Sequence, residues 1–322
     1  MNRALRLAGS WRVLLALAPV LFAIAAVDLA AQFAARPAGS GDTPIVSGNG
    51  RPPARFPSPD ATVLWAVGDI ADCGSAGDEA TARLLGASEG PIALLGDLAY
   101  GSGTQQQFAD CYGASWGGLA DRVRPSPGNH EYQSTDAGPY FAYFGAAAGD
   151  PARGYYSYEI GAWHIIALNS NCDPVGGCDD SSAQLRWLTE DLAQSNASCT
   201  LAYWHHPLFS SGQHGDDGRM RQAYELLDAA GADVVLAGHD HDFERFAPQD
   251  ANGQATVDGV RQFVVGTGGK SLRAFDEVRA NSEVRFSGDF GALRLALEPS
   301  SYAWDFTTVA GRTVDSGTAE CR

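Results

Sequence analysis

The sequence predicts a layered α/β sandwich built from mixed β-sheets. In the middle of the chain, apolar runs with strand character alternate with helical patterns, which is typical of neighbouring strands joined by helical crossovers. In the last third of the chain, strand patterns follow one another with few helices between them. Most of the apolar runs end in a glycine followed by a polar residue, so the strand ends are expected to carry polar side chains.

The first 60 residues are expected to lie outside this fold. Residues 1–36 combine a basic start, an apolar run over 13–27 and small residues after it, the layout of a secretory signal peptide. A retained N-terminal membrane anchor is the alternative. Residues 37–60 are rich in Pro, Gly and Ser and indicate a linker. We therefore expect one folded domain over residues 61–322, secreted or otherwise extracytoplasmic.

The elements of this domain follow from local patterns. A strand at 61–69, a helix at 78–88 and a strand at 90–97 form the first crossover unit. Residues 154–170 predict two strands joined by a turn that contains glycine. The helix predicted at 181–195 has a serine near its start and leucines on one face.

The second half continues in the same way. A strand at 200–207, a helix at 220–231 that ends at a glycine, and a strand at 232–241 are expected next. Three more strands are predicted at 260–269, 292–299 and 302–310. The last third is therefore dominated by strands.

The six cysteines favour an oxidising compartment, because no C-x-x-C pair suggests a zinc knuckle. Cys172 and Cys178 flank the turn-rich segment DPVGG and are expected to pair. The other expected pairs are Cys73–Cys111 and Cys199–Cys321. Sequence alone leaves other connectivities open.

The charge balance limits the classes of partner. Acidic residues outnumber basic ones 38 to 22, which gives a net charge of −16. This charge disfavours nonspecific binding to nucleic acid or to anionic membranes, and we expect no nucleic-acid partner. An anionic substrate would need local positive charge, which bound metal cations supply.

Polar residues gather at five strand ends: Gly68-Asp69, Gly96-Asp97, Gly128-Asn129-His130, His205-His206 and Gly238-His239-Asp240-His241. In open α/β sheets, ligands bind beyond the carboxyl ends of the strands. A glycine before the polar residue permits a sharp turn that directs the side chain inward. One such corner is usually a cap or a turn, but five in succession indicate a shared site. Their oxygen and nitrogen donors suit Zn, Mn or Fe.

Five motifs carry a family resemblance: GDI (68–70), GDLAY (96–100), GNHE (128–131), HHPLF (205–209) and GHDH (238–241). Together they resemble the calcineurin-like metallophosphoesterases and, within them, the purple acid phosphatases. The resemblance spans about residues 61–270. It implies a four-layer α/β/β/α sandwich of two mixed β-sheets flanked by helices.

One departure points to the purple subclass. Many members of the superfamily carry D-x-H at the first corner, but Ala71 stands at that histidine position and cannot coordinate a metal. The purple enzymes use a tyrosine three residues after the second aspartate instead, and Tyr100 occupies that position. A trivalent cation favours a phenolate ligand, because the ordinary tyrosine pKa is about 10.

The resemblance implies two metal ions. The first, Fe(III) in the resembling enzymes, would be held by Asp69, Tyr100 and His241. The second, Fe(II), Zn or Mn, would be held by Asn129, His205 and His239. The carboxylate of Asp97 would bridge the two ions and offset their repulsion.

Four further histidines have expected roles. His130 resembles the family histidine that faces the substrate phosphate, and His214 matches a substrate-facing histidine of the plant-type enzymes. His206 follows a predicted ligand in an extended segment, so its side chain is expected to point away from the metals and to have a supporting role. His164, in the middle of a strand, is expected to be a core histidine with satisfied hydrogen bonds.

The implied function is hydrolysis of a small phosphate monoester by in-line attack of a metal-bound hydroxide. His130, with His214, would stabilise developing charge or protonate the leaving group. One alternative is an exported phosphodiesterase or nucleotidase of the same fold, because substrate choice depends on loops such as 101–118 and 133–155. The other is a catalytically silent surface binding protein.

Overall fold

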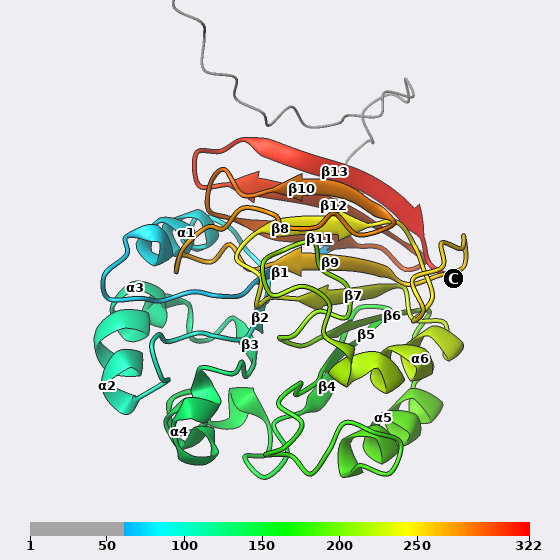
Figure 1. The fold of residues 1–322 in the computed structure, drawn as a ribbon, viewed down its shortest axis with the longest axis horizontal. Coiled ribbons are helices and arrows are strands. Elements are labelled where there is room, and N and C mark those ends of the chain that lie inside the picture. Colours follow the sequence, from blue (N-terminus) through cyan, green and yellow to red (C-terminus); the bar gives the residue numbers. More distant parts are fainter. Residues whose placement is uncertain (1–60) are drawn as a thin grey trace, which may run out of the picture. The chain divides into compact units, whose positions relative to one another are not determined.

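The computed structural model describes residues 61–322, which form two β-sheets packed face to face with helices on both outer surfaces (Figure 1). The six-stranded sheet has the order β13-β12-β11-β1-β2-β3, and the seven-stranded sheet has the order β10-β8-β9-β7-β6-β5-β4. Both sheets are mixed, since each contains parallel and antiparallel pairs. The predicted four-layer α/β/β/α sandwich is confirmed.

The strands of the six-stranded sheet are β1 (Thr62–Val67), β2 (Ile92–Leu95), β3 (Val123–Ser126), β11 (Gly291–Leu297), β12 (Ser301–Thr308) and β13 (Thr313–Glu320). Those of the seven-stranded sheet are β4 (Tyr156–Ile160), β5 (Trp163–Ala167), β6 (Cys199–Tyr203), β7 (Val234–Ala237), β8 (Phe243–Phe246), β9 (Arg261–Val265) and β10 (Ser282–Phe286).

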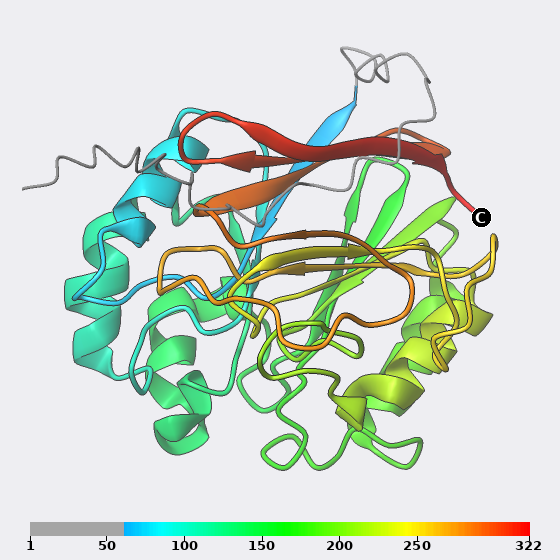
Figure 2. The same ribbon diagram turned by 45° about the horizontal axis from the view of Figure 1, so that its top comes forward.

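The helices divide into two groups, one on each side of the sandwich (Figure 2). The six-stranded sheet is covered by α1 (Gly77–Gly86), α3 (Gly113–Trp116) and α4 (Gly138–Phe144), and the short helix α2 (Gln105–Gln107) lies beside α4 without buried residues of its own. A π-helical turn over Phe108–Tyr112 joins α2 to α3. The seven-stranded sheet is covered by α5 (Ala183–Gln194) and α6 (Arg221–Ala229).

The apolar core has three layers, one between the sheets and one beneath each group of helices. Strand β1 shows how one sequence serves two layers. Its Leu64 and Ala66 pack in the layer between the sheets, whereas Trp65 and Val67 pack beneath the helices. Successive strand residues point to opposite faces, so a sheet covered on both sides requires the continuous apolar run that this strand has.

The structure contains every strand and helix predicted from the sequence. It also contains elements that were not predicted, namely the α2–α4 region and strands β3, β8, β10 and β13. Strand β3 is short and contains Pro125, and β13 has many polar residues. Both are edge strands, where a proline and exposed polar side chains are tolerated because one side of the strand makes no ladder bonds.

All three expected disulfides are present, Cys73–Cys111, Cys172–Cys178 and Cys199–Cys321. The predicted signal peptide or anchor and the predicted linker lie outside the described residues. Within residues 61–322, none of the helices has the length and apolar character needed to span a bilayer.

Candidate metal centre

The predicted site residues follow the carboxyl ends of parallel strands from both sheets. Asp69, Asp97 and Asn129 come shortly after β1, β2 and β3, which lie side by side. His205 and His239 come shortly after β6 and β7 of the other sheet. Because these strand ends meet at one edge of the sandwich, the five side chains converge.

The backbone at three of these corners has an uncommon conformation. Asp69, Asp97 and His239 have φ angles of 60°, 54° and 72°, in the left-handed region that non-glycine residues seldom adopt. The ligand residues thus take part in the turns that we expected at the preceding glycines, of which Gly96 has a left-handed φ of 83°. Such conformations cluster at functional sites, where surrounding contacts compensate for their cost.

The glycines at these corners leave space for the side chains of the predicted ligands. A Cβ atom at Gly128 would lie 2.1 Å from Asp97 Oδ1, and one at Gly238 would lie 2.7 Å from Asp69 Oδ2. Both separations are shorter than nonbonded atoms tolerate, so any larger residue would displace a predicted ligand. The G-N and G-H pairs of the motifs thus have a steric explanation.

Tyr100 is the centre of the first group of donor atoms. Its hydroxyl oxygen lies 2.8 Å from Asp69 Oδ1, 3.1 Å from His241 Nε2 and 3.1 Å from Asp97 Oδ2. The residue is buried, with 4% of its surface exposed. These are the residues that the sequence assigned to the first metal, together with the proposed bridge.

His205 is the centre of the second group. Its Nε2 atom lies 3.1 Å from Asn129 Oδ1, 3.1 Å from His239 Nδ1 and 3.2 Å from Asp97 Oδ2. Asp97 Oδ2 is therefore the atom shared by the two groups. The structure brings together all seven predicted metal ligands and places the predicted bridge between the two sets.

The donor set fits cations better than it fits hydrogen bonds alone. His205 Nδ1 lies 2.7 Å from the carbonyl oxygen of Leu95, which places one proton there, so the neutral form of this imidazole, the form that binds metals, has its lone pair on Nε2. That lone pair faces an amide oxygen, a carboxylate oxygen and a second imidazole nitrogen. Tyr100 likewise has one proton for two carboxylate oxygens, those of Asp69 and Asp97. Converging acceptors of this kind are the arrangement that a metal ion satisfies.

The electrostatics of the metal-free centre point the same way. Burial together with the Asp69 and Asp97 carboxylates raises the pKa of Tyr100 well above its usual value. A phenolate at this position therefore requires a strongly polarising cation. Burial and the neighbouring His205 and His214 lower the pKa of His239 to about 2. Its imidazole is thus neutral, the form that binds metals.

Asp97 and His205 form a coupled pair. Burial opposes ionisation of Asp97, but His205 and His130 outweigh it and lower the pKa of this carboxyl. Burial would also lower the pKa of His205, but Asp97 outweighs it and raises the value to about 9. Without metals, the negative charge of the bridge is thus compensated by a proton on the adjacent histidine.

The two predicted catalytic histidines flank the centre on different sides. The His130 ring packs on Tyr100 with 4.4 Å between ring centroids, and 27% of its side chain is exposed. Its Nε2 lies 3.8 Å from Asp97 Oδ2. The His214 ring stacks on His239 at 4.2 Å. Each histidine is therefore in contact with a different one of the two ligand sets.

His206 differs from expectation in its direction but not in its supporting position. Its ring does not point away, because the ring centroid lies 4.8 Å from that of His205 and 4.5 Å from that of His239. Its Nδ1 is 2.8 Å from the Ser170 hydroxyl. His164 is confirmed as a buried histidine with both ring nitrogens paired, at 2.7 Å from Glu159 and 2.7 Å from Asp191.

Sequence reasoning missed Glu131 as a functional residue. Its fully buried carboxylate accepts the backbone N–H groups of Asp97, Leu98 and Gly128 at 2.9, 2.8 and 2.7 Å. Burial and the nearby Asp97 raise its pKa to about 7. The signal was available in the last letter of GNHE, a carboxylate directly after a predicted ligand turn.

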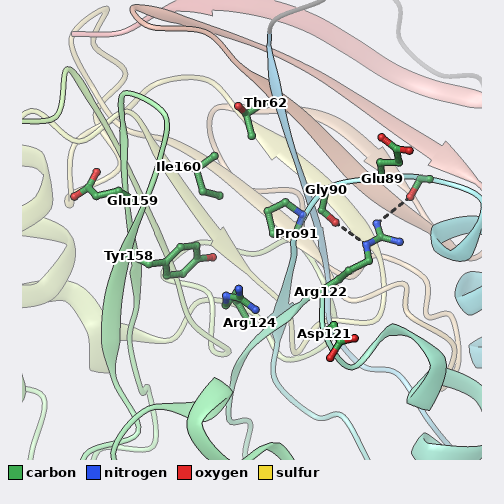
Figure 3. Close-up of a pocket in the computed structure, with 11 residues that line it drawn as sticks. Thr62, Glu89, Gly90, Pro91, Asp121, Arg122, Arg124, Tyr158, Glu159 and Ile160 are labelled. Atoms are coloured by element: carbon green, nitrogen blue, oxygen red, sulfur yellow. Dashed lines mark hydrogen bonds between the residues drawn. The ribbon is translucent and has the colours of Figure 1, made fainter.

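A pocket of about 550 Å³ lies at the opposite ends of the strands from the metal centre. It opens between β2 and β3 of one sheet and β4 of the other, and Figure 3 shows Arg122, Arg124 and Tyr158 on its walls. The Arg122 guanidinium donates to the carbonyl oxygens of Gly90 and Leu85, so it supports the loop before β2. None of the predicted site residues lines this pocket.

Comparisons with known proteins agree with this geometry. Residues 61–243 match the family model for the calcineurin-like phosphoesterase family. Purple acid phosphatase 18 of Arabidopsis thaliana is 30% identical over 277 residues, covering 78% of this chain and 60% of that protein. Purple acid phosphatase 21 of the same plant is 31% identical and covers 63% and 50%. The chain thus spans about half of these relatives' length.

Solved structures show the same fold. A purple acid phosphatase from yellow lupin (Lupinus luteus) seeds aligns with a TM-score of 0.72 and 18% identity, covering 81% of this chain and 54% of that one. An anchor protein of the inner membrane complex of Plasmodium aligns with a TM-score of 0.63 and 13% identity, covering 81% and 89%. By its family match, its fold and the groups of metal-binding residues at its strand ends, the chain belongs to the calcineurin-like phosphoesterase family.

Proposed function

We propose that this chain is an exported binuclear-metal phosphoesterase that hydrolyses small phosphate monoesters. The observation that carries the proposal is the position of Asp97 Oδ2, which lies 3.1 Å from the Tyr100 hydroxyl and 3.2 Å from His205 Nε2. One carboxylate oxygen within reach of two complete donor sets is the arrangement that a pair of cations requires. The similarity to purple acid phosphatases supports the same activity.

The two donor sets differ in kind, which suggests two different metals. The set with the Tyr100 phenol and two carboxylates would hold Fe(III), because hard anionic oxygens suit a trivalent ion. The set with two imidazoles and the Asn129 amide would hold Fe(II), Zn or Mn. When bound, the metals supply Lewis acidity toward the phosphoryl oxygens and acidify a coordinated water.

The chain's own residues would then orient the ester and move a proton. His130 is partly exposed beside Tyr100, and its main-chain N–H is held by Asp97 Oδ1 at 2.9 Å. This position suits it to contact the phosphate or to protonate the leaving alkoxide. His214 lies on the other side, stacked on His239. The two rings would thus border the substrate from opposite sides.

Export is supported by the three disulfides, which are typical of oxidising compartments. The N-terminal segment, as a signal peptide or a retained tether, would provide the route. A net charge of −16 disfavours nucleic acid as a partner and is compatible with a small ester attracted by metal cations.

The test is hydrolysis of p-nitrophenyl phosphate by protein folded with its disulfides and loaded with iron and zinc. We expect turnover that is lost on chelation and restored by the metals. Faster cleavage of bis-p-nitrophenyl phosphate would favour the phosphodiesterase alternative instead. Fewer than about one metal equivalent after loading, with no turnover, would contradict the proposal and favour a silent binding protein.

A further inference from the structure

The segment that follows β9 borders the metal centre and is tied to it through the backbone. The N–H of Lys270 donates to the carbonyl oxygen of Asp69 at 3.1 Å, and the N–H of Arg273 donates to that of His241 at 3.0 Å. Both acceptors belong to predicted ligands of the first metal. The segment therefore places two cationic side chains at positions fixed relative to the centre.

These two cations have different partners. The Lys270 ammonium is paired with the Asp72 carboxylate and lies 5.0 Å from the centroid of the Tyr100 ring. The Arg273 guanidinium has no carboxylate partner among the ion pairs of residues 61–322. Its side-chain contact is His214, whose Nε2 lies 2.5 Å from Arg273 Nη1. One positive charge is thus compensated within the protein and the other is not.

The Arg273 guanidinium is connected to the candidate metal centre through His214. The His214 ring that it contacts stacks on His239, with 4.2 Å between centroids. The main-chain N–H of His214 is itself held by Asp240 Oδ1 at 2.8 Å, so the backbone at this residue has a defined place. Arg273 therefore lies one imidazole ring away from a predicted ligand of the second metal. It is also half-buried, which makes an absent counter-ion more costly than at the surface.

A phosphate group would supply the missing counter-ion. The planar guanidinium binds phosphate oxygens through parallel N–H donors, and such charged hydrogen bonds are among the strongest in proteins. A monoester phosphate carries a second negative charge above a pH of about 6, which a diester lacks. A diester also has one terminal oxygen fewer to offer to the protein.

We propose that Arg273, next to His214, binds a terminal oxygen of the substrate phosphate and makes the site selective for monoesters over diesters. This inference rests on the proposed function, because it concerns substrate choice at the same centre. The inference adds to that function a specific residue, Arg273, that distinguishes esters by the charge of their phosphate group. Arg273 belongs to none of the five motifs.

The test compares wild type with Arg273→Gln, Arg273→Lys and Arg83→Gln at pH 7. The last variant removes an exposed guanidinium on α1 and is the matched control for net charge. For Arg273→Gln we expect KM for p-nitrophenyl phosphate to rise about tenfold, with kcat nearly unchanged, because a charged hydrogen bond to the substrate is lost. KM for bis-p-nitrophenyl phosphate should change by less than about twofold. For Arg273→Lys, KM for p-nitrophenyl phosphate should lie between the values for wild type and Arg273→Gln. Both KM values of Arg83→Gln should match those of wild type.

Calorimetric titration of metal-loaded protein with inorganic phosphate gives a readout that does not need turnover. Binding should weaken about tenfold in Arg273→Gln and stay unchanged in Arg83→Gln. The inference would be overturned if Arg273→Gln raised KM equally for both esters. It would also be overturned if this variant bound phosphate as tightly as wild type or lost its metal. Wild-type protein that turns over neither ester but binds phosphate through Arg273 would refute the proposed function alone. Normal turnover with no effect at Arg273 would refute this inference alone.

Discussion

Glu131 holds Asp97 in place through the main chain. Its carboxylate accepts the Asp97 N–H at 2.9 Å and the Gly128 N–H at 2.7 Å, so it joins the corner after β2 to the corner after β3. The first corner carries the predicted bridging carboxylate of Asp97 and the second carries Asn129. The fully buried Glu131 therefore fixes the relative position of two predicted ligands of the second metal.

Replacing this carboxylate tests its positioning role. In Glu131→Gln, one acceptor oxygen and an NH₂ donor would face four backbone donors, so at least one N–H would lose its partner. We expect affinity for the second metal to fall about 10- to 100-fold while the fold is retained. Metal titration with circular dichroism as the control checks this. A variant that binds both metals like wild type would show that Glu131 has no such role.

Asp97 itself is expected to be indispensable. An asparagine keeps the shape of the side chain but removes the charge that offsets repulsion between two cations. Asp97→Asn should therefore retain at most about one metal ion and lose at least about 1,000-fold in activity toward p-nitrophenyl phosphate. Asp121→Asn, which removes an exposed carboxylate far from the centre, should behave as wild type. Two bound metals in Asp97→Asn would exclude the bridging role.

Local patterns predicted the part of the site that lies at strand ends. Asp69, Asp97, Asn129, His205 and His239 could be placed together because parallel strands deliver their carboxyl ends to one edge of a sheet. The strands and helices between these residues were predictable from the periodicity of their apolar residues. Strand β3, with its Pro125 and its edge position, has too weak a pattern to be found in this way.

Residues that act through irregular segments could not be predicted. Arg273 lies 32 positions after His241, and only the path of the chain after β9 brings it to His214. The contact depends on backbone hydrogen bonds that leave no sequence period. Glu131 is intermediate, since its motif was recognised, but its four main-chain N–H partners could be identified only from the turn geometry. The same holds for the left-handed backbone of Asp69, Asp97 and His239, which the motifs did not predict.

Colour tests the identity of the first metal. Tyr100→Phe removes the only phenol in the first donor set while keeping an aromatic ring in the same buried position. If Fe(III) is bound there, the wild-type protein should absorb visible light through the tyrosinate, and the variant should lose that absorption. Absorption spectra at equal iron content measure this. A colourless but fully active wild type would instead indicate Zn or Mn at this position.

His164 predicts how stability depends on pH, away from the metal centre. It bridges Glu159 on β4 and Asp191 on α5 at 2.7 Å each, and Ser157 donates to the same Asp191. Burial alone would lower the pKa of His164, but the hydrogen bonds to Asp191 and Glu159 outweigh burial and raise it. Because the folded state holds the proton more tightly than the unfolded state, this stabilisation is fully present below the unfolded pKa of about 6.5. The stabilisation is lost as the pH rises through the higher pKa that His164 has in the folded protein.

The thermal unfolding of His164→Asn should therefore differ from wild type mainly under acidic conditions. At pH 6 we expect the variant to be less stable by about 2 kcal/mol, mostly through the bond to Asp191, because Glu159 is largely exposed. The difference should shrink as the pH rises through the raised folded pKa of His164, above which the wild-type imidazole is neutral and can donate to only one carboxylate. Comparing the two proteins at each pH cancels the pH dependence of metal binding, which both share. Tm differences that stay constant from pH 6 to about 9 would mean that the charge on His164 contributes nothing and that only its packing matters.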